Sequence, residues 1–436
     1  MNLKAKKIKA PMSVQFELTY ECNNYCLFCY NVWKNPENKD NTKTGEDKKN
    51  ELLSYKEICN ILDKINSDGV FHLTFTGGEP TLHPEFLKVL EYGYKIGLNP
   101  SFVTNGNLIT KQYARGIKNT GVVHCQVSMH GSNKEIHEKL TQVKGSFNKV
   151  INAIKNLVAE GINVNVNMTV NKLNKDNIWD TAVLVKELGV KYFSITRFVA
   201  VGSGLANSNE IGLELSDMDH LVEEIARVEK ELNMNIKVLT PIPLCSIKNP
   251  EKVAGKMSGC DGGITWCAIS PSGKIRHCTN VDEIAGDLKE NTLSEIWSNG
   301  KAFNICRNFD HIPEECRQCE AFFFCGGGCR ACAYNASKGD LKAPDPSSNF
   351  NNRETIAYKC EKIKDKMIQE QNNMIEETDK LLEVSHNKIF PLINGHLRVR
   401  EEEFGLLANT GLSHTIVNKD GLEILKLCNG KRSLED

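Results

Sequence analysis

Residues 21–30, E-C-N-N-Y-C-L-F-C-Y, decide the fold and the chemistry of this chain because they carry three closely spaced cysteines. Three residues separate Cys22 from Cys26, two separate Cys26 from Cys29, and Phe28 precedes the last cysteine. This spacing places three thiols on one tight loop. An iron-sulfur cubane is commonly held by four cysteine thiolates, so three thiolates leave one iron open to bind another molecule. A structural zinc loop is the alternative interpretation.

The composition is that of a globular protein without a strong net charge. The chain has 436 residues, 40% of them hydrophobic, which is enough for two or three domains with a substantial core. Lys plus Arg (54) and Asp plus Glu (55) nearly cancel, so we expect no nucleic-acid partner. No apolar run of about 18 residues is present, and no apolar stretch follows the basic start, so we expect no membrane association and a cytoplasmic location. In that compartment seventeen cysteines indicate metal binding rather than disulfides.

Short β-rich runs alternate with amphipathic helical stretches in the first half of the chain. The predicted strands are residues 14–19, 72–76, 101–104, 122–128, 164–169 and 192–196. Ser54 with Glu57 predicts a capping box at the start of one helix, and Thr110 and Ser146 are predicted caps for two others. The pattern predicts an α/β fold with a partial (β/α)6 barrel over residues 12–212. In such barrels the chemistry lies at the C-terminal ends of the strands.

The second half of the chain has a different composition. A connector at 201–212 and a helix at 216–232 lead, through a connecting region at 213–245, into a predicted iron-sulfur domain at 246–365. Eleven cysteines lie between Cys245 and Cys360 with few long hydrophobic runs, which favours folding around metal. Residues 388–436 begin with a strand-like pattern and contain a helix-like stretch at 421–428. We expect them to form a small winged-helix-like unit.

Glycine and polar residues follow the predicted strands. Gly77, Gly78, Glu79 and Pro80 come directly after the second strand, and glycines there let the backbone approach a ligand closely. A plain βα turn is the alternative for this motif. The third and fourth strands are followed by Thr104, Asn105, Gly106, Ser128 and His130. Each of these residues alone is equally consistent with turn formation.

The pattern C-x3-C-x-aromatic-C resembles the signature of the radical S-adenosylmethionine (SAM) enzymes. The resemblance implies that the three cysteines hold a 4Fe-4S cluster whose open iron binds SAM. One electron would cleave SAM to methionine and a 5′-deoxyadenosyl radical, which abstracts hydrogen from an unactivated carbon. The SAM-contacting residues implied by the resemblance are Phe28, Gly77, Gly78, Glu79, Pro80, Thr104, Asn105 and Ser128. Thr141 and Gln142 stand where relatives commonly have Arg-Gly, and Lys139 and Lys144 are candidate substitutes for that arginine.

A second resemblance lies in the cysteine-rich half. The C-x2-C-x5-C-x3-C spacing that begins at Cys316, with Cys260, Gly273 and Cys278 upstream, is similar to the SPASM extension of radical SAM enzymes, which holds two auxiliary 4Fe-4S clusters. A zinc ribbon is the alternative. The resemblance assigns one cluster to Cys260, Cys267, Cys278 and Cys329, and the other to Cys316, Cys319, Cys325 and a later cysteine.

The fourth ligand of the second auxiliary cluster departs from the family pattern. Relatives often place it soon after an Asp-Pro, but here Asp345-Pro346 is followed by two serines. Cys360 is the favoured candidate, with Cys332 or a non-cysteine group as alternatives. The cysteines outside this assignment are Cys59, Cys125, Cys245, Cys306, Cys332 and Cys428. Cys59 and Cys125 are predicted to be buried small hydrophobic residues.

The function implied by the resemblance is an oxidative radical reaction. Residues 398–430 resemble the small domain that binds leader sequences of ribosomally made peptides, by adding an edge strand. A docking or dimerisation role is the alternative for this segment. The predicted substrate is therefore a peptide or small protein that acquires a crosslink, a thioether or a related modification. A flavodoxin- or ferredoxin-type reductant is the expected electron donor. The alternatives are an enzyme acting on a tetrapyrrole side chain, suggested by the sequence at 327–330, a sulfatase-type protein activator, and a non-enzymatic electron carrier.

Overall fold

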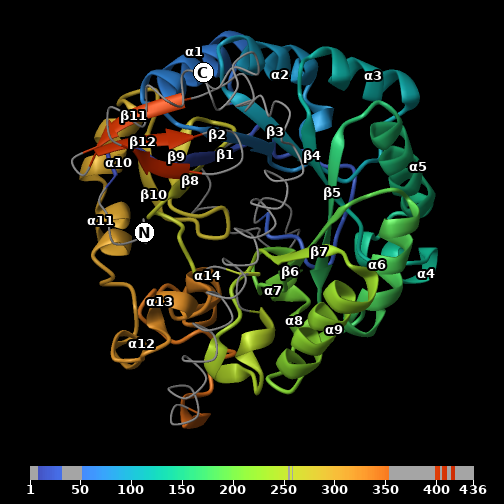
Figure 1. The fold of residues 1–436 in the computed structure, drawn as a ribbon. Coiled ribbons are helices and arrows are strands. Elements are labelled where there is room, and N and C mark those ends of the chain that lie inside the picture. Colours follow the sequence, from blue (N-terminus) through green and yellow to red (C-terminus); the bar gives the residue numbers. More distant parts are fainter. Residues whose placement is uncertain are drawn as a thin grey trace, which may run out of the picture.

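The computed structural model describes residues 8–31, 52–253, 256–257, 259–352, 398–402, 405–409 and 414–417. Six parallel strands alternate with helices in the first half of the chain, as predicted. The strands are β1 (Ser13–Glu17), β2 (His72–Thr76), β3 (Asn99–Thr104), β4 (His124–Ser128), β5 (Asn163–Val170) and β6 (Tyr192–Arg197). The helices are α1 (Tyr55–Ser67), α2 (Phe86–Lys95), α3 (Lys111–Asn119), α4 (Lys134–Thr141), α5 (Ser146–Ala159) and α6 (Ile178–Glu187). Figure 1 shows the strands in a curved sheet with these helices outside it.

The sheet continues beyond the six predicted strands at both edges. β7 (Asn235–Val238) pairs in parallel with β6, after helix α9 (Asp217–Leu232). At the other edge β8 (Trp266–Ile269) pairs in parallel with β1 and is followed by the antiparallel strands β9 (Lys274–Arg276) and β10 (Ile284–Asp287). The strand order is β10-β9-β8-β1-β2-β3-β4-β5-β6-β7. The first strands of the cysteine-rich segment therefore belong to the same sheet as the barrel.

Apolar side chains on the strands and helices form the core of the barrel. Phe16 and Phe75 are fully buried, and their ring centroids lie 6.0 Å apart. In α1 the buried positions Ile58, Ile61 and Ile65 recur with the three-to-four residue spacing that places them on one helix face. This spacing packs the helix against the sheet.

Two of the three predicted helix caps are present. Ser54 and Glu57 form the capping box of α1, and the Thr110 hydroxyl accepts the Tyr113 backbone N–H at 3.1 Å. The prediction for Ser146 is wrong: Gly145, with φ 83°, is the N-cap of α5. The hydroxyl of Ser146 is instead 2.8 Å from that of Thr141, so it stabilises the junction between α4 and α5.

Short helices lie before β7 and after β10. The segment predicted as a connector contains α7 (Ser203–Ala206) and α8 (Ser208–Ile211). After β10 come α10 (Leu293–Asn299), α11 (Lys301–Arg307), α12 (Glu314–Arg317), α13 (Phe322–Cys325) and α14 (Arg330–Ala336). Trp297 anchors this part to the N-terminal segment, because its indole N–H donates to the Ile8 carbonyl at 2.9 Å.

The C-terminal segment contains a three-stranded antiparallel sheet of β11 (Arg398–Glu402), β12 (Gly405–Asn409) and β13 (His414–Val417). The Arg400 guanidinium docks this sheet by donating to the carbonyls of Ala10 (2.8 Å) and Gly69 (3.2 Å) and pairing with Glu402 at 2.7 Å. These carbonyls precede β1 and β2. The predicted winged helix is not confirmed, because the helix-like stretch at 421–428 lies outside the described residues.

Candidate functional site

The loop after β1 carries three half-buried cysteines, Cys22, Cys26 and Cys29. Backbone hydrogen bonds fix the loop against the end of α4: the Tyr25 N–H donates to the Thr141 carbonyl, and the Leu27 N–H donates to the Leu140 carbonyl, each at 3.0 Å. Thr141 is one of the two residues that replace the family's Arg-Gly. Thr141 therefore holds the cysteine loop through its backbone carbonyl, and this contact does not depend on the identity of the side chain.

The glycine pair after β2 lies directly against the cysteine loop. The Gly78 N–H donates to the Thr19 carbonyl and the Glu79 N–H donates to the Glu21 carbonyl, each at 2.7 Å. A Cβ at Gly78 would overlap the Glu21 carbonyl, and one at Gly77, which has φ 128°, would lie 2.5 Å from the Thr19 oxygen. Glycine is required here because two backbones meet without space for a side chain.

Glu79 is the buried acidic centre of this region. Its carboxylate accepts the hydroxyls of Thr81 (2.6 Å) and Thr104 (2.7 Å) and the Asn105 backbone N–H (2.7 Å). Burial raises the pKa of Glu79, and these hydrogen bonds oppose the shift. The Asn105 amide in turn lies 3.7 Å from the Cys22 sulfur. Glu79 thus joins the C-terminal ends of β2 and β3 to the cysteine loop.

The remaining predicted SAM contacts lie at the same ends of the strands. Pro80 begins the short 3₁₀ helix η4 (Pro80–Leu82), which Glu79 caps, and Ser128 is the half-buried last residue of β4. The Phe28 ring lies edge-on to the His130 ring, with centroids 4.5 Å apart. Burial lowers the pKa of His130 well below its usual value, so this imidazole is neutral at pH 7.

An ion pair that sequence reasoning missed connects the barrel to β9. Glu17, at the end of β1, pairs with Arg276, and both side chains are buried. The hydroxyl of Tyr30, next to Cys29, donates to Glu17 at 3.4 Å. The acidic residue at a strand end and the basic residue just before Cys278 are visible in the sequence, but their pairing depends on β8 joining β1.

Three of the four cysteines predicted for the first auxiliary cluster lie together. The pKa of Cys278 is raised by burial and by the neighbouring thiols of Cys260 and Cys329. Cys267 does not join them. It lies on β8 in the main hydrophobic core, and burial alone raises its pKa. Cys332 instead packs with Cys278 and Cys329 in a small buried cluster at the end of the barrel.

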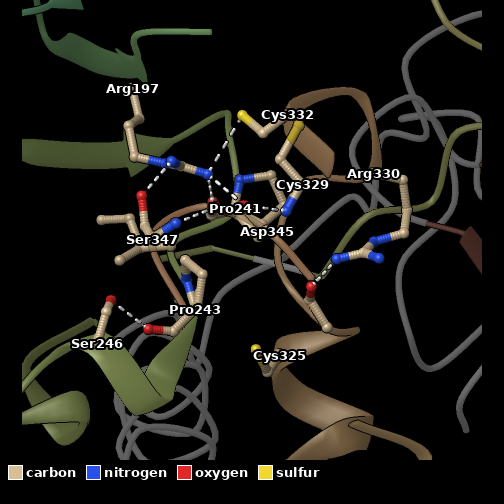
Figure 2. Close-up of polar contacts among 12 residues, drawn as sticks. Arg197, Pro241, Pro243, Ser246, Cys325, Cys329, Arg330, Cys332, Asp345 and Ser347 are labelled. Atoms are coloured by element: carbon tan, nitrogen blue, oxygen red, sulfur yellow. Dashed lines mark hydrogen bonds and ion pairs between the residues drawn. The ribbon is translucent and has the colours of Figure 1, made fainter. Parts of the chain in front are cut away.

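An arginine from the barrel organises this thiol group (Figure 2). Arg197, at the end of β6, pairs with Asp345 at 2.6 Å and donates to the Cys332 sulfur at 3.6 Å. Asp345 also accepts the Cys329 backbone N–H at 2.8 Å. A hydrogen bond from the Cys332 thiol and the charge of Arg197 lower the pKa of Cys329 to about 7. The Asp-Pro of the family pattern therefore supports Cys329 through its aspartate.

A second group of thiols lines one pocket. Its cysteines are Cys245, Cys316, Cys319 and Cys325. Burial and the Cys325 and Cys245 thiols contribute to raising the pKa of Cys316 to about 12. The favoured fourth ligand, Cys360, lies outside the described residues. Cys245 was not assigned in the sequence, because it precedes the recognised spacing.

A zinc site is the alternative interpretation of the thiol groups. A zinc site holds its ligands at about 2.0–2.3 Å from a single point. Within the described ranges no group of three or more His, Cys, Asp or Glu residues has such an arrangement. Soft thiolates spread around a common pocket instead suit an iron-sulfur cluster, which is larger than a single ion.

Comparison with known proteins agrees with this geometry. The model of the Radical SAM superfamily matches residues 16–185, and the SPASM iron-sulfur cluster-binding domain matches residues 260–320. The chain is a radical SAM enzyme with a SPASM domain. The two matches cover the cysteine loop, the Gly77–Gly78 pair and the start of the auxiliary thiol groups. The radical SAM enzyme therefore binds SAM and iron-sulfur clusters.

Relatives of this radical SAM enzyme have different substrates. An AdoMet-dependent heme synthase of Methanosarcina barkeri is 28% identical over 350 residues, 77% of this chain and 96% of the relative. A PqqA peptide cyclase of Ruegeria pomeroyi is 26% identical and covers 78% of this chain and 87% of the relative. The structure of Streptococcus suis SuiB bound to precursor peptide SuiA has the same fold, with a TM-score of 0.63, 18% identity, and coverage of 79% of this chain and 77% of SuiB.

None of the helices in the described ranges is long and apolar enough to cross a membrane.

Proposed function

We propose that this radical SAM enzyme oxidatively modifies a ribosomally made peptide, forming a crosslink, a thioether or a related product at a C–H bond. The observation that carries the peptide assignment is that the buried arginines around the thiol groups already have partners within the chain. Arg197 and Arg276 each pair with a carboxylate of the chain, and Arg330 donates to the backbone carbonyls of Gly327, Leu341 and Ala343. A peptide backbone is neutral and needs no buried cation, whereas a substrate with several carboxylates would compete for these arginines.

The residues of the cysteine loop have defined roles in this proposal. Cys22, Cys26 and Cys29 would hold the SAM-binding cluster, and Glu79 keeps the glycine pair and the cysteine loop together. Phe28, Pro80, Thr104, Asn105 and Ser128 surround the same ends of the strands. When bound, the clusters and SAM supply one-electron chemistry: reductive cleavage of SAM for hydrogen abstraction, and acceptance of the electron left on the substrate. The chain's own contribution is to position SAM and substrate and to exclude water.

The auxiliary clusters would be held by the two thiol groups. Cys260, Cys278 and Cys329 support the first, and Cys316, Cys319 and Cys325 support the second. With the SAM-binding cluster this makes three 4Fe-4S clusters. A flavodoxin- or ferredoxin-type protein would deliver the electron that starts each turnover.

The C-terminal sheet supports a peptide substrate in a second way. Antiparallel strands can bind an extended peptide as an added strand through backbone hydrogen bonds. Arg400 fixes this sheet at the N-terminal ends of the barrel strands, whereas the cysteine loop follows their C-terminal ends. The two sites are separated by at least the length of β1, ~17 Å at 3.3 Å per residue. The substrate would therefore need a recognition segment distinct from the modified residue.

The test is an anaerobic reconstitution followed by an assay with two substrate classes. We expect about twelve irons per chain, and 5′-deoxyadenosine formation from SAM and dithionite that is lost in Cys26→Ala. Short peptides encoded beside the gene should increase SAM cleavage. The modified peptide should be lighter than the starting peptide by two hydrogens. Full iron loading without SAM cleavage would contradict the proposal.

A second candidate is a reaction on a tetrapyrrole side chain. The observation in its favour is the 28% identity to an AdoMet-dependent heme synthase across most of both chains. An iron tetrapyrrole with propionate side chains is the matching probe. Consumption of this probe with SAM, together with no reaction on any peptide, would replace the peptide assignment with this one.

A further inference from the structure

We infer that Cys245 supplies the fourth thiolate of the second auxiliary cluster, in place of a cysteine after the Asp-Pro. The inference rests on the proposed auxiliary clusters and adds a ligand that the SPASM spacing does not contain. Cys245 lies 71 positions before Cys316, on the barrel side of the chain. The ligand set would therefore bridge two parts of the molecule.

The backbone around Cys245 is held against another thiol of the group. Cys245 is the central residue of the 3₁₀ helix η6 (Leu244–Ser246), which follows β7. The Leu244 N–H donates to the Cys325 sulfur at 3.5 Å. The Ser246 hydroxyl donates to the Pro243 carbonyl at 2.6 Å (Figure 2). These two bonds fix the turn that carries Cys245 beside Cys325.

The pocket itself suits a ligand of thiolates. Besides the four cysteines, its lining is largely apolar and includes Pro243, Leu244, Phe322 and Phe350. Burial and the Cys325 thiol raise the pKa of Cys245, while the Asn349 backbone N–H, 3.3 Å from its sulfur, lowers it. Four thiols that line one apolar pocket match in number and type the four thiolates that commonly hold a 4Fe-4S cluster.

The segment after the Asp-Pro reaches this same pocket. Asp345 is fixed by Arg197, and the chain then turns so that Ser348 lines the pocket and Asn349 donates to Cys245. Relatives often carry a ligand cysteine in this stretch, but serine is present here. Cys245 lines the pocket beside this segment, and the segment contributes a backbone donor to the Cys245 sulfur instead of a thiolate.

The other candidate in the described part of the chain belongs to a different group. Cys332 contacts Arg197 and hydrogen-bonds to Cys329, in the first thiol group. Cys360 is therefore the competing ligand that an experiment must separate from Cys245.

The experiment uses the full chain with Cys22, Cys26 and Cys29 replaced by alanine, so that only auxiliary clusters can bind. This background should hold about eight irons. Adding Cys245→Ala should lower the count toward four, or leave a three-iron cluster visible by electron paramagnetic resonance. Cys360→Ala and the matched control Cys59→Ala, a buried cysteine on α1, should keep eight. Cys316→Ala is the positive control for loss.

Each result separates the ligand assignment from the cluster assignment. A background that holds no iron would contradict the auxiliary clusters themselves. The role of Cys245 would be overturned if the background holds eight irons and Cys245→Ala keeps all eight. It would also be overturned if Cys360→Ala loses as many irons as Cys245→Ala. Cys245→Ser is a second variant that guards against misfolding because it keeps the side-chain size. Loss of one cluster in Cys245→Ser supports the inference. Loss of all iron from both Cys245 variants would show a structural role for Cys245 and overturn the inference.

Discussion

The core between the barrel sheet and its helices is mainly apolar, whereas the buried residues of 259–350 include thiols, arginines and the carboxylate of Asp345. In the barrel, side chains such as Phe16, Phe75 and Phe102 are fully buried, and long helices cover the sheet. In the cysteine-rich region the helices after β10 have only four to seven residues. Helices this short are not stable without tertiary contacts. The difference suggests that the barrel folds through its apolar core, while the second region depends on its metal.

Iron removal should show the largest difference between the two regions. Anaerobic chelation of the reconstituted protein should lower the free energy of local opening in residues 259–350 by about 5 kcal/mol or more, because buried thiols lose their ligand. Peptides from β2 to β5 should keep their protection. Hydrogen exchange with mass spectrometry measures both regions in one sample, and equal loss of protection in barrel and cysteine-rich peptides would contradict the comparison.

The ion pair between the regions should have the next largest effect. Arg197→Met leaves Asp345 buried without its cation, which should cost about 3–5 kcal/mol in the free energy of unfolding. Lys95→Met breaks the exposed pair with Glu91 and should cost about 1 kcal/mol or less. Chemical denaturation of the iron-loaded variants gives both values.

A double variant sharpens the result for Arg197. If the cost comes from the uncompensated charge, Arg197→Met with Asp345→Leu should be more stable than Arg197→Met alone. A double variant that is less stable than both single variants would indicate that Asp345 acts mainly through its bond to the Cys329 N–H.

The close contact between the glycine pair and the cysteine loop can be tested by activity. Gly78→Ala places a Cβ onto the Glu21 carbonyl and should displace the loop that carries Cys22. A misplacement of about 1 Å can lower a rate about 100-fold, and we expect a loss of that size in SAM cleavage. Gly97→Ala is the control. Gly97 has a φ of +85°, so alanine there should lower stability, but its Cβ meets no atom within 4 Å and SAM cleavage should be unchanged.

Local sequence patterns predicted the barrel well because its strands and helices depend on near neighbours. All six strands are present within a few residues of their predicted ends, and the cysteine loop and Glu79 lie at the same edge of the sheet. The prediction for Ser146 failed because its hydroxyl bonds to Thr141 rather than to the backbone of its own helix.

Long-range pairing explains what the sequence did not reveal. Strand β8 joins β1 across more than 250 residues, so the pair Glu17 and Arg276 has no local signal. Cys267 looks like a ligand by spacing, but it lies on the buried face of that strand. Cys245 precedes the recognised cysteine spacing, and its nearness to Cys325 follows from the path of the chain after β7.

Acid should weaken the barrel as well as the cysteine-rich region, which gives the smallest contrast between them. Burial lowers the pKa of His137 in α4 and of His277 after β9 from 6.5 to about 4. Between these pKa values the unfolded chain binds a proton that the folded chain does not, so stability falls as pH decreases below about 6.5. At pH 5 each histidine should cost about 2 kcal/mol relative to pH 7. His137→Gln keeps an acceptor for the His130 backbone N–H. The variant should remove the contribution of His137 to the pH dependence of stability in barrel peptides, measured by hydrogen exchange at pH 5 and pH 7. An unchanged slope would mean that His137 takes up a proton in the folded state.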